Sequence, residues 1–315
     1  MSDHSKFPAW ITDAVNKNSD QISPKSKEFF EKLLELVPHF DQAFLSIPAT
    51  LDVGVLKSYD PKEVQRHFGL ESPHEFILLN VLELFHFQAT YQLRELALSL
   101  IGALADGRFY VAALMNRAML EVVCVNYYTF RRAEKQFKQC VDLLKNAAKT
   151  KSQTERSRLV NDYYQGTYEI FSKVFDANAA SSISWSDYLQ DRFNVKIETG
   201  DDVKKIHVGT AIPDIEKQSG LPINNSYNVL SEFVHPNAGS KMLIVKTKQS
   251  RYPLMDALTI GENKENAEAA LFYVDHLAES MYYAWTLSLT LSHRGQELIA
   301  ILDRLVPKGA SRNVH

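Results

Sequence analysis

The stretch from 73 to 105, PHEFILLNVLELFHFQATYQLRELALSLIGALA, restricts the fold of this chain more than any other feature. Its apolar residues keep helical spacing throughout, and Ser72 before it is a favourable helix start. Asp106 and Gly107 then predict a tight turn, followed by a second helix from 108 to about 134. Because so short a connection leaves two helices side by side and antiparallel, the sequence predicts a central helical hairpin.

The other helical patterns extend this hairpin into an all-α fold. We predict a helical bundle with an irregular insertion at about 177–225, where the periodicity weakens. Inside that insertion, 194–199 and 205–210 could pair as a small β-hairpin, and 241–248 is compatible with either strand or helix. The four helices that form the predicted bundle are 73–105, 108–134, 226–235 and 265–300.

The domain organisation follows from where these patterns begin and end. Residues 1–70 are predicted to be an N-terminal helical extension, with a first long helix from Pro24 and a short helix closed by Gly69. Residues 71–305 form the bundle domain, and 306–315 form a tail. No repeat of fixed period is visible, which argues against a solenoid.

Composition restricts the cellular setting. The net charge of −3 predicts neither nucleic acid nor an acidic membrane as an obligatory partner. The two cysteines, Cys124 and Cys140, form no C-x-x-C pair, which is typical of a reduced intracellular protein. The N-terminus lacks the basic and then apolar pattern of a secretory signal, so a cytoplasmic location is expected. No membrane span is expected, because charged residues interrupt 111–130 and 280–291 is too short.

A run of basic residues lies in the predicted helical region after residue 134. In the stretch KNAAKTKSQTERSR such residues are typical of a solvated surface, and a nucleic-acid-binding face is the alternative. The residues concerned are Lys145, Lys149, Lys151, Arg156 and Arg158.

A charged pair interrupts the apolar helix 108–134. Arg117 and Glu121 are four residues apart and therefore share one helical face, where they can bond to each other or to a common partner. A buried ion pair has to be satisfied by its surroundings, since removing one partner costs about 3–5 kcal/mol. Two hypotheses remain open for the pair: a structural lock between packed helices, or a ligand or catalytic site.

The stretch SYNVLSEFVHPNAGS, 226–240, places three polar side chains on one side of a short helix. Tyr227, Ser231 and His235 recur every fourth residue and therefore line one slanting stripe. Asn225 or Ser226 is expected to cap the helix. Pro236 follows at once and ends it, which predicts that His235 points out of the packed region. We expect this stripe to lie against Arg117 and Glu121.

These residues carry a resemblance to a known family. The motifs R-x3-E (Arg117, Glu121) and Y-x3-S-x3-H-P (Tyr227, Ser231, His235) resemble those of uncharacterised microbial all-α proteins with a fold similar to the HEPN superfamily. That superfamily is named for higher-eukaryote and prokaryote nucleotide-binding domains. Many of its members are ribonucleases of toxin and phage-defence systems that act as dimers. The resemblance covers about 75–240 of this chain.

The resemblance implies an RNA-cleaving or nucleotide-binding effector, homodimeric and without a cofactor. His235 would then act as general acid or base, Arg117 would stabilise charge on phosphate, and Glu121 would orient one of them. The substrate-binding residues would be Tyr227, Ser231 and Asn237. Ribonuclease members carry their Arg and His four to six residues apart on one helix, whereas here the pair would have to assemble from two helices.

Two alternatives belong to other classes of protein. The first is a non-catalytic helical module that binds a protein partner, in which the polar residues only fix the packing of the helices. The second is a di-metal carboxylate bundle, because two Glu-x-x-His pairs are present. Its ligands would come from Glu83 with His86 and Glu232 with His235, and from Glu121 or Glu279.

Overall fold

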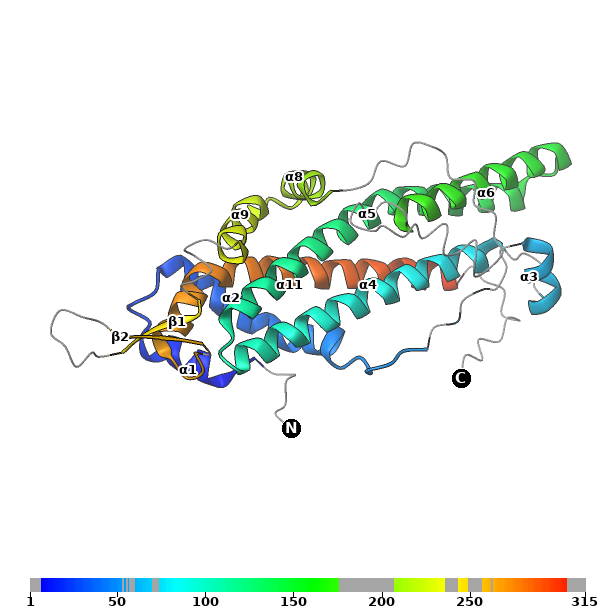
Figure 1. Ribbon diagram of the computed structural model, residues 1–315. Helices are drawn as coiled ribbons and strands as arrows, with labels where there is room; N and C mark the ends of the chain where they lie inside the picture. Colours follow the sequence, from blue (N-terminus) through cyan, green and yellow to red (C-terminus); the bar gives the residue numbers. More distant parts are fainter. Residues whose placement is uncertain are drawn as a thin grey trace. The chain divides into compact units, whose positions relative to one another are not determined.

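The computed structural model describes residues 7–52, 54, 56, 60–69, 74–175, 207–235, 243–248, 257–261 and 263–304 (Figure 1). These residues are almost all helical, which confirms the predicted all-α class. A small antiparallel hairpin is added, in which Val245 pairs with Ile260. In chain order the elements are α1 (Ala9–Lys17), α2 (Pro24–Phe40), the π-helix η1 (Asp41–Leu45), α3 (Pro61–Phe68), α4 (His74–Ala105), α5 (Phe109–Lys149), α6 (Gln153–Phe175), α8 (Val208–Ser219), α9 (Ile223–Val234), β1 (Val245–Lys248), β2 (Ala257–Ile260) and α11 (Ala267–Asp303).

The predicted bundle helices are found close to their expected limits. The segments 73–105, 226–235 and 265–300 correspond to α4, α9 and α11, and 108–134 corresponds to the first part of α5. Helix α5 continues to Lys149, because the apolar spacing persists beyond 134 and buries Phe137, Val141 and Leu144.

The expected insertion is only partly within the described residues, since 176–206 lie outside them. In the remainder, helix α8 occupies 208–219, so the strand predicted at 205–210 is wrong where it is described. Ala211, Ile212 and Ile215 are buried at helical spacing, and this buried face favours the helix. The segment 241–248, compatible with strand or helix, contains strand β1, because β2 supplies the hydrogen-bonding partner.

Two compact units make up the chain. Unit 1 comprises Met1–Pro48, Thr90–Cys124 and Ile212–Thr290. Unit 2 comprises Ala49–Ala89, Val125–Ala211 and Leu291–His315. The expected N-terminal extension, 1–70, is therefore divided between them, and α4, α5 and α11 each contribute a segment to both. The domain limits predicted at 70 and 305 stay a prediction.

The core of unit 1 is aromatic. The ring of Phe40, at the end of α2, stacks on Trp285 of α11 at 4.3 Å and on Phe44 of η1 at 4.6 Å. A second group joins Phe109 of α5 to Tyr273 of α11 at 5.3 Å. All five side chains are fully or almost fully buried. Such stacked and tilted rings bury large areas and fix α2, α5 and α11 against one another.

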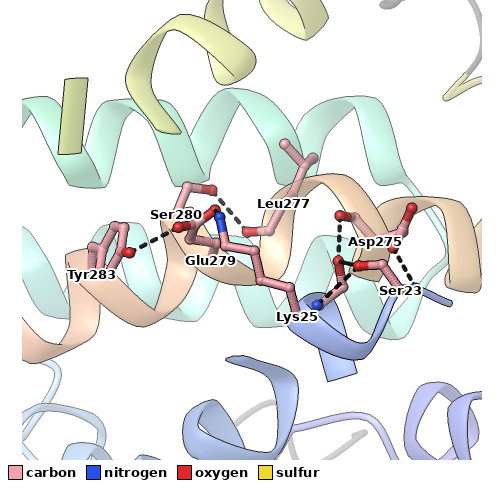
Figure 2. Close-up of polar contacts among 8 residues, drawn as sticks. Ser23, Lys25, Asp275, Leu277, Glu279, Ser280 and Tyr283 are labelled. Atoms are coloured by element: carbon pink, nitrogen blue, oxygen red, sulfur yellow. Dashed lines mark hydrogen bonds and ion pairs between the residues drawn. The ribbon is translucent and has the colours of Figure 1, made fainter. Parts of the chain in front are cut away.

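Polar contacts also hold α2 against α11 in unit 1 (Figure 2). The backbone N–H of Ser23 donates to Asp275 Oδ1 at 3.0 Å, and Ser26 Oγ donates to the Asp275 carbonyl at 2.8 Å. Lys25 and Glu279 form an ion pair at 3.0 Å. Burial raises the pKa of Asp275, but the hydrogen bonds from Ser23 and Ser26 outweigh it and lower the pKa overall. These contacts fix the start of α2 against one turn of α11.

The predicted turn between α4 and α5 is confirmed, and it has the hydrogen bonds of a Schellman motif. Gly107 N–H donates to Leu104 O at 3.1 Å and Arg108 N–H donates to Ala103 O at 2.8 Å. Gly107 has a φ of +69°, in the left-handed region that glycine adopts readily. Its carbonyl accepts from the backbone of Asn263 at 2.9 Å, which brings the chain before α11 against the turn.

Unit 2 packs its helices around small and aromatic residues. Phe85 of α4 stacks on Phe130 of α5, with 6.2 Å between ring centroids. His86 of α4 is buried against Gly295 of α11, so closely that a Cβ at Gly295 would lie 2.3 Å from the imidazole Nδ1. A glycine inside a helix costs about 1 kcal/mol relative to alanine. At this position it provides the space for the imidazole.

We expect His86 to make the protein acid-sensitive. Burial lowers the pKa of His86 from 6.5 to about 4. Between these values the unfolded chain binds the proton and the folded chain does not, so the free energy of unfolding falls as the pH falls. The loss is about 3 kcal/mol once the pH is below both values. Urea unfolding of wild type and His86→Gln at about pH 7 and pH 4 measures it. The same pH dependence in both proteins contradicts the prediction.

Candidate functional site

The predicted pair on α5 is present in unit 1. Arg117 Nε donates to Glu121 Oε1 at 3.0 Å, one helical turn away. The exposed fractions of the two side chains are 22% and 36%, so the pair is partly buried. Met119 and Leu120 beside it are fully buried and anchor this part of α5 in the core. Both charges are thereby held at the edge of the core, where each can still reach solvent.

Tyr227 of α9 completes a three-residue site. Its hydroxyl accepts from Arg117 Nη2 at 3.1 Å and donates to Glu121 Oε1 at 2.8 Å. The guanidinium carbon also lies 5.3 Å from the centroid of the tyrosine ring, within the range of a cation–π contact. The expected contact of this stripe with Arg117 and Glu121 is therefore confirmed for Tyr227. We call these three residues the Arg117 cluster.

The pKa values of Arg117 and Tyr227 are both shifted upward. Partial burial lowers the pKa of Arg117, but the hydrogen bond to Tyr227 and the charge of Glu121 raise it by more, so the net shift is upward. Burial raises the pKa of Tyr227, and Glu121 raises it further against the opposing effect of Arg117. Arg117 is consequently a permanent cation and Tyr227 a neutral phenol at neutral pH. Neither can act as a general base there.

Contacts at both ends position α9 in unit 1. The expected side-chain cap from Asn225 or Ser226 is wrong: Pro222 precedes the first turn and no side chain of that residue caps it. Instead, the Asn224 N–H donates to Glu216 Oε1 of α8 at 2.6 Å. Sequence reasoning missed Glu216, because its carboxylate reaches a helix end eight residues away and no capping motif marks it.

The C-terminal half of α9 packs on α11. The Phe233 ring lies 5.9 Å from Phe272 and 5.7 Å from His276. Phe233 and Leu230 are buried, whereas the polar residues predicted beside them are at least partly exposed. The aromatic contacts therefore fix how α9 presents Tyr227 to α5.

The other predicted site residues are not brought into the cluster. Ser231 Oγ donates to the Tyr227 carbonyl at 2.9 Å, a hydrogen bond within its own helix. His235 follows the last helical residue in an extended conformation, with φ −75° and ψ 152°, and is exposed. Among the described residues its side chain has no hydrogen-bond or ion-pair partner. Asn237 lies outside the described residues.

The metal hypothesis gains no support from the described residues. Within those ranges, no group of three or more His, Cys, Asp and Glu side chains is placed to hold a metal ion. Glu279, one of the suggested ligands, instead pairs with Lys25 and accepts from Tyr283 at 2.8 Å. Glu121 is engaged with Arg117 and Tyr227.

Neither cysteine resembles a nucleophile. Cys124 and Cys140 are free thiols and both are buried. Burial, together with the charges of Glu121 and Glu216, raises the pKa of Cys124. The thiolate is consequently disfavoured at that position.

Among the described residues, one helix meets the length and composition required for a membrane span. Helix α5 contains a sufficiently apolar window, of which 44% is buried inside the protein. Central helices of helical bundles meet the same criterion, so this is weak evidence for a membrane location.

No protein-family model matches this chain, and no curated protein or solved structure shows significant similarity to it. The similarity to HEPN proteins therefore rests on the Arg117 and Tyr227 motifs and stays a prediction.

Proposed function

We propose that this chain is a HEPN-like effector of stress or phage defence that binds nucleotide or RNA through Arg117. The proposal includes a cytoplasmic homodimer. The proposal rests on the hydrogen bonds of the Arg117 guanidinium. Glu121 and Tyr227 hold its Nε and Nη2 in place, while its Nη1 has no acceptor among the described residues. A guanidinium that is already held in place and partly exposed can bind phosphate with little further loss of side-chain entropy.

The geometry of α9 favours binding over cleavage at a single phosphate. His235 lies eight residues beyond Tyr227, which corresponds to about 12 Å along a helix at 1.5 Å per residue. A general acid or base has to be within hydrogen-bond reach of the same reacting group that the arginine contacts. A ligand that meets both residues would therefore be longer than one phosphate, such as a nucleotide with its base or a short RNA strand.

A specific observation favours a second candidate function, a non-catalytic protein-interaction module. The Tyr227 hydroxyl both donates and accepts within the Arg117 cluster, and Glu121 neutralises the charge of Arg117. This closed set of contacts between α5 and α9 is what a structural lock requires. The lock would fix α9 while another surface binds the partner.

The Tyr227→Phe variant separates the two candidates. A lock loses two hydrogen bonds, so we expect the free energy of unfolding to fall by about 1–3 kcal/mol and the melting temperature by about 2–6 °C. A ligand site, in addition, loses affinity for nucleotides or a short oligoribonucleotide, which calorimetry measures. Tyr110→Phe is the matched control on α5, because this partly buried tyrosine has no hydrogen-bond partner for its hydroxyl among the described residues.

Expression in a bacterial host tests RNA cleavage directly. Wild type, Arg117→Ala and His235→Ala are compared at matched soluble levels, and total RNA is analysed from each culture. If the protein cleaves RNA with these residues, wild type alone arrests growth and fragments RNA. The proposed function is overturned in favour of the lock by three results together. None of the three proteins arrests growth or fragments RNA, wild type binds no nucleotide, and Arg117→Ala has a lower melting temperature than wild type.

A further inference from the structure

The second half of α5 and the start of α6, both in unit 2, concentrate positive charge. Residues 131–158 contain nine Lys and Arg against three Asp and Glu, a net charge of +6, whereas the whole chain carries −3. The rest of the protein is therefore acidic. A local basic region of this size attracts anions even when the net charge of the protein is negative. Its basic residues are Arg131, Arg132, Lys135, Lys138, Lys145, Lys149, Lys151, Arg156 and Arg158.

Five of these residues form one stripe along α5. Successive spacings of four, three, seven and four residues place them within about 80° of one another around the helix axis, at 100° per residue. From first to last the stripe extends about 27 Å, at 1.5 Å per residue. Asp142 lies in the gap between its third and fourth members. The basic stripe consists of Arg131, Lys135, Lys138, Lys145 and Lys149.

Most of the stripe is available to a ligand. Lys135, Lys145 and Lys149 are exposed and have no acidic partner among the described residues. Lys138 pairs with Glu134 at 2.7 Å, a contact across one turn of an exposed helix face. Such surface pairs contribute little to stability, so a phosphate group can replace the carboxylate at low cost.

The connection between α5 and α6 and the first turn of α6 extend this basic surface. Helices α5 and α6 pack closely in unit 2, since a Cβ at Gly166 would lie 2.9 Å from the Cys140 sulfur (Figure 1). Lys151 in the connection and Arg156 in the first turn of α6 are exposed, again without an acidic partner in the described part of the chain. These two cations continue the basic surface beyond the end of α5.

We infer that the basic stripe binds the phosphate backbone of RNA. Cations repeated along about 27 Å of a helix suit a linear polyanion better than a single phosphate. An anionic membrane fits less well, because a helix that binds a membrane surface inserts an apolar face. Here the apolar face of α5, with Phe137, Val141 and Leu144, is already buried in unit 2. The inference does not depend on the Arg117 cluster, which belongs to unit 1.

The test uses the full chain and a fluorescein-labelled, single-stranded RNA of mixed sequence, with affinity measured by fluorescence anisotropy at several salt concentrations. The stripe variant is Lys135→Gln/Lys145→Gln/Lys149→Gln. The control is Lys17→Gln/Lys62→Gln/Lys217→Gln, which removes the same charge from exposed positions elsewhere. We expect the stripe variant to bind at least about tenfold more weakly and to reduce the slope of log K against log salt by about 2. The control should stay within about twofold of wild type.

Three outcomes overturn the inference: wild type does not bind this RNA, the stripe variant binds it as wild type does, or both triple variants lose affinity equally. Binding of the same variants to phosphatidylserine vesicles is also measured. Vesicle binding that depends on the stripe, without RNA binding, would assign the surface to membranes and overturn the inference. Arg117→Gln distinguishes this inference from the proposed function. That variant should lose nucleotide binding but lower the salt slope with the longer RNA by less than about 1, against about 2 for the stripe variant.

Discussion

Gly107→Ala is expected to lower the free energy of unfolding by about 4 kcal/mol or more. The new Cβ would lie 2.1 Å from the backbone nitrogen of Lys264 and 2.5 Å from the carbonyl carbon of Asn263. These are backbone atoms and cannot turn aside as a flexible side chain can. The φ of +69° adds the cost of a left-handed alanine, about 1–2 kcal/mol.

Gly220→Ala is the matched control for Gly107→Ala. Gly220 has a φ of +71°, but a Cβ there meets nothing within 4 Å. The control therefore reports the conformational cost alone, about 1–2 kcal/mol. Urea unfolding of the two variants, monitored by circular dichroism, gives the difference between them. Equal losses would show that the contact of Gly107 with 263–264 does not contribute to stability.

Trp285→Ala is expected to cost about 3–5 kcal/mol, with the loss of ring stacking included. The indole has no exposed surface and stacks on Phe40 at 4.3 Å with 19° between the rings. Its removal leaves a cavity between α2 and α11 and deprives Phe40 of a stacked neighbour. The melting temperature should fall by about 6 °C or more.

Trp285→Phe tests whether the ring or its polar group is responsible. The indole Nε1 is buried and has no hydrogen-bond partner among the described residues. Phenylalanine keeps an aromatic surface against Phe40 and removes this unsatisfied donor, so the expected loss is only about 1–2 kcal/mol. A loss as large as that of Trp285→Ala would contradict the stacking explanation.

The helices could be predicted because their causes are local. The spacing of apolar residues in 73–105 and the Asp106–Gly107 pair act within a few turns of the chain, and α4 and its turn appear where they were expected. Short segments without a regular stripe were harder. The strand expected at 205–210 is helical from 208, and β1 could be assigned only through its pairing with β2.

The candidate site was predictable in part. Arg117 and Glu121 share a face by their spacing alone, and the ion pair follows from the helix. The place of Tyr227 in the site required the packing of α9, since 110 residues separate it from Arg117 along the chain. The same packing leaves His235 exposed at the end of α9, although its spacing from Tyr227 suggested that both would join one site.

Interactions within a few helical turns are therefore enough to specify the all-α class, the main helices, the central turn and the pairing of Arg117 with Glu121. Contacts between distant segments could be identified only in the folded protein: the Tyr227 hydroxyl between Arg117 and Glu121, the carboxylate of Glu216 at the start of α9, and the backbone of 263–264 against Gly107. Their physical origin is packing, which selects one arrangement of buried faces from many that the same local pattern allows.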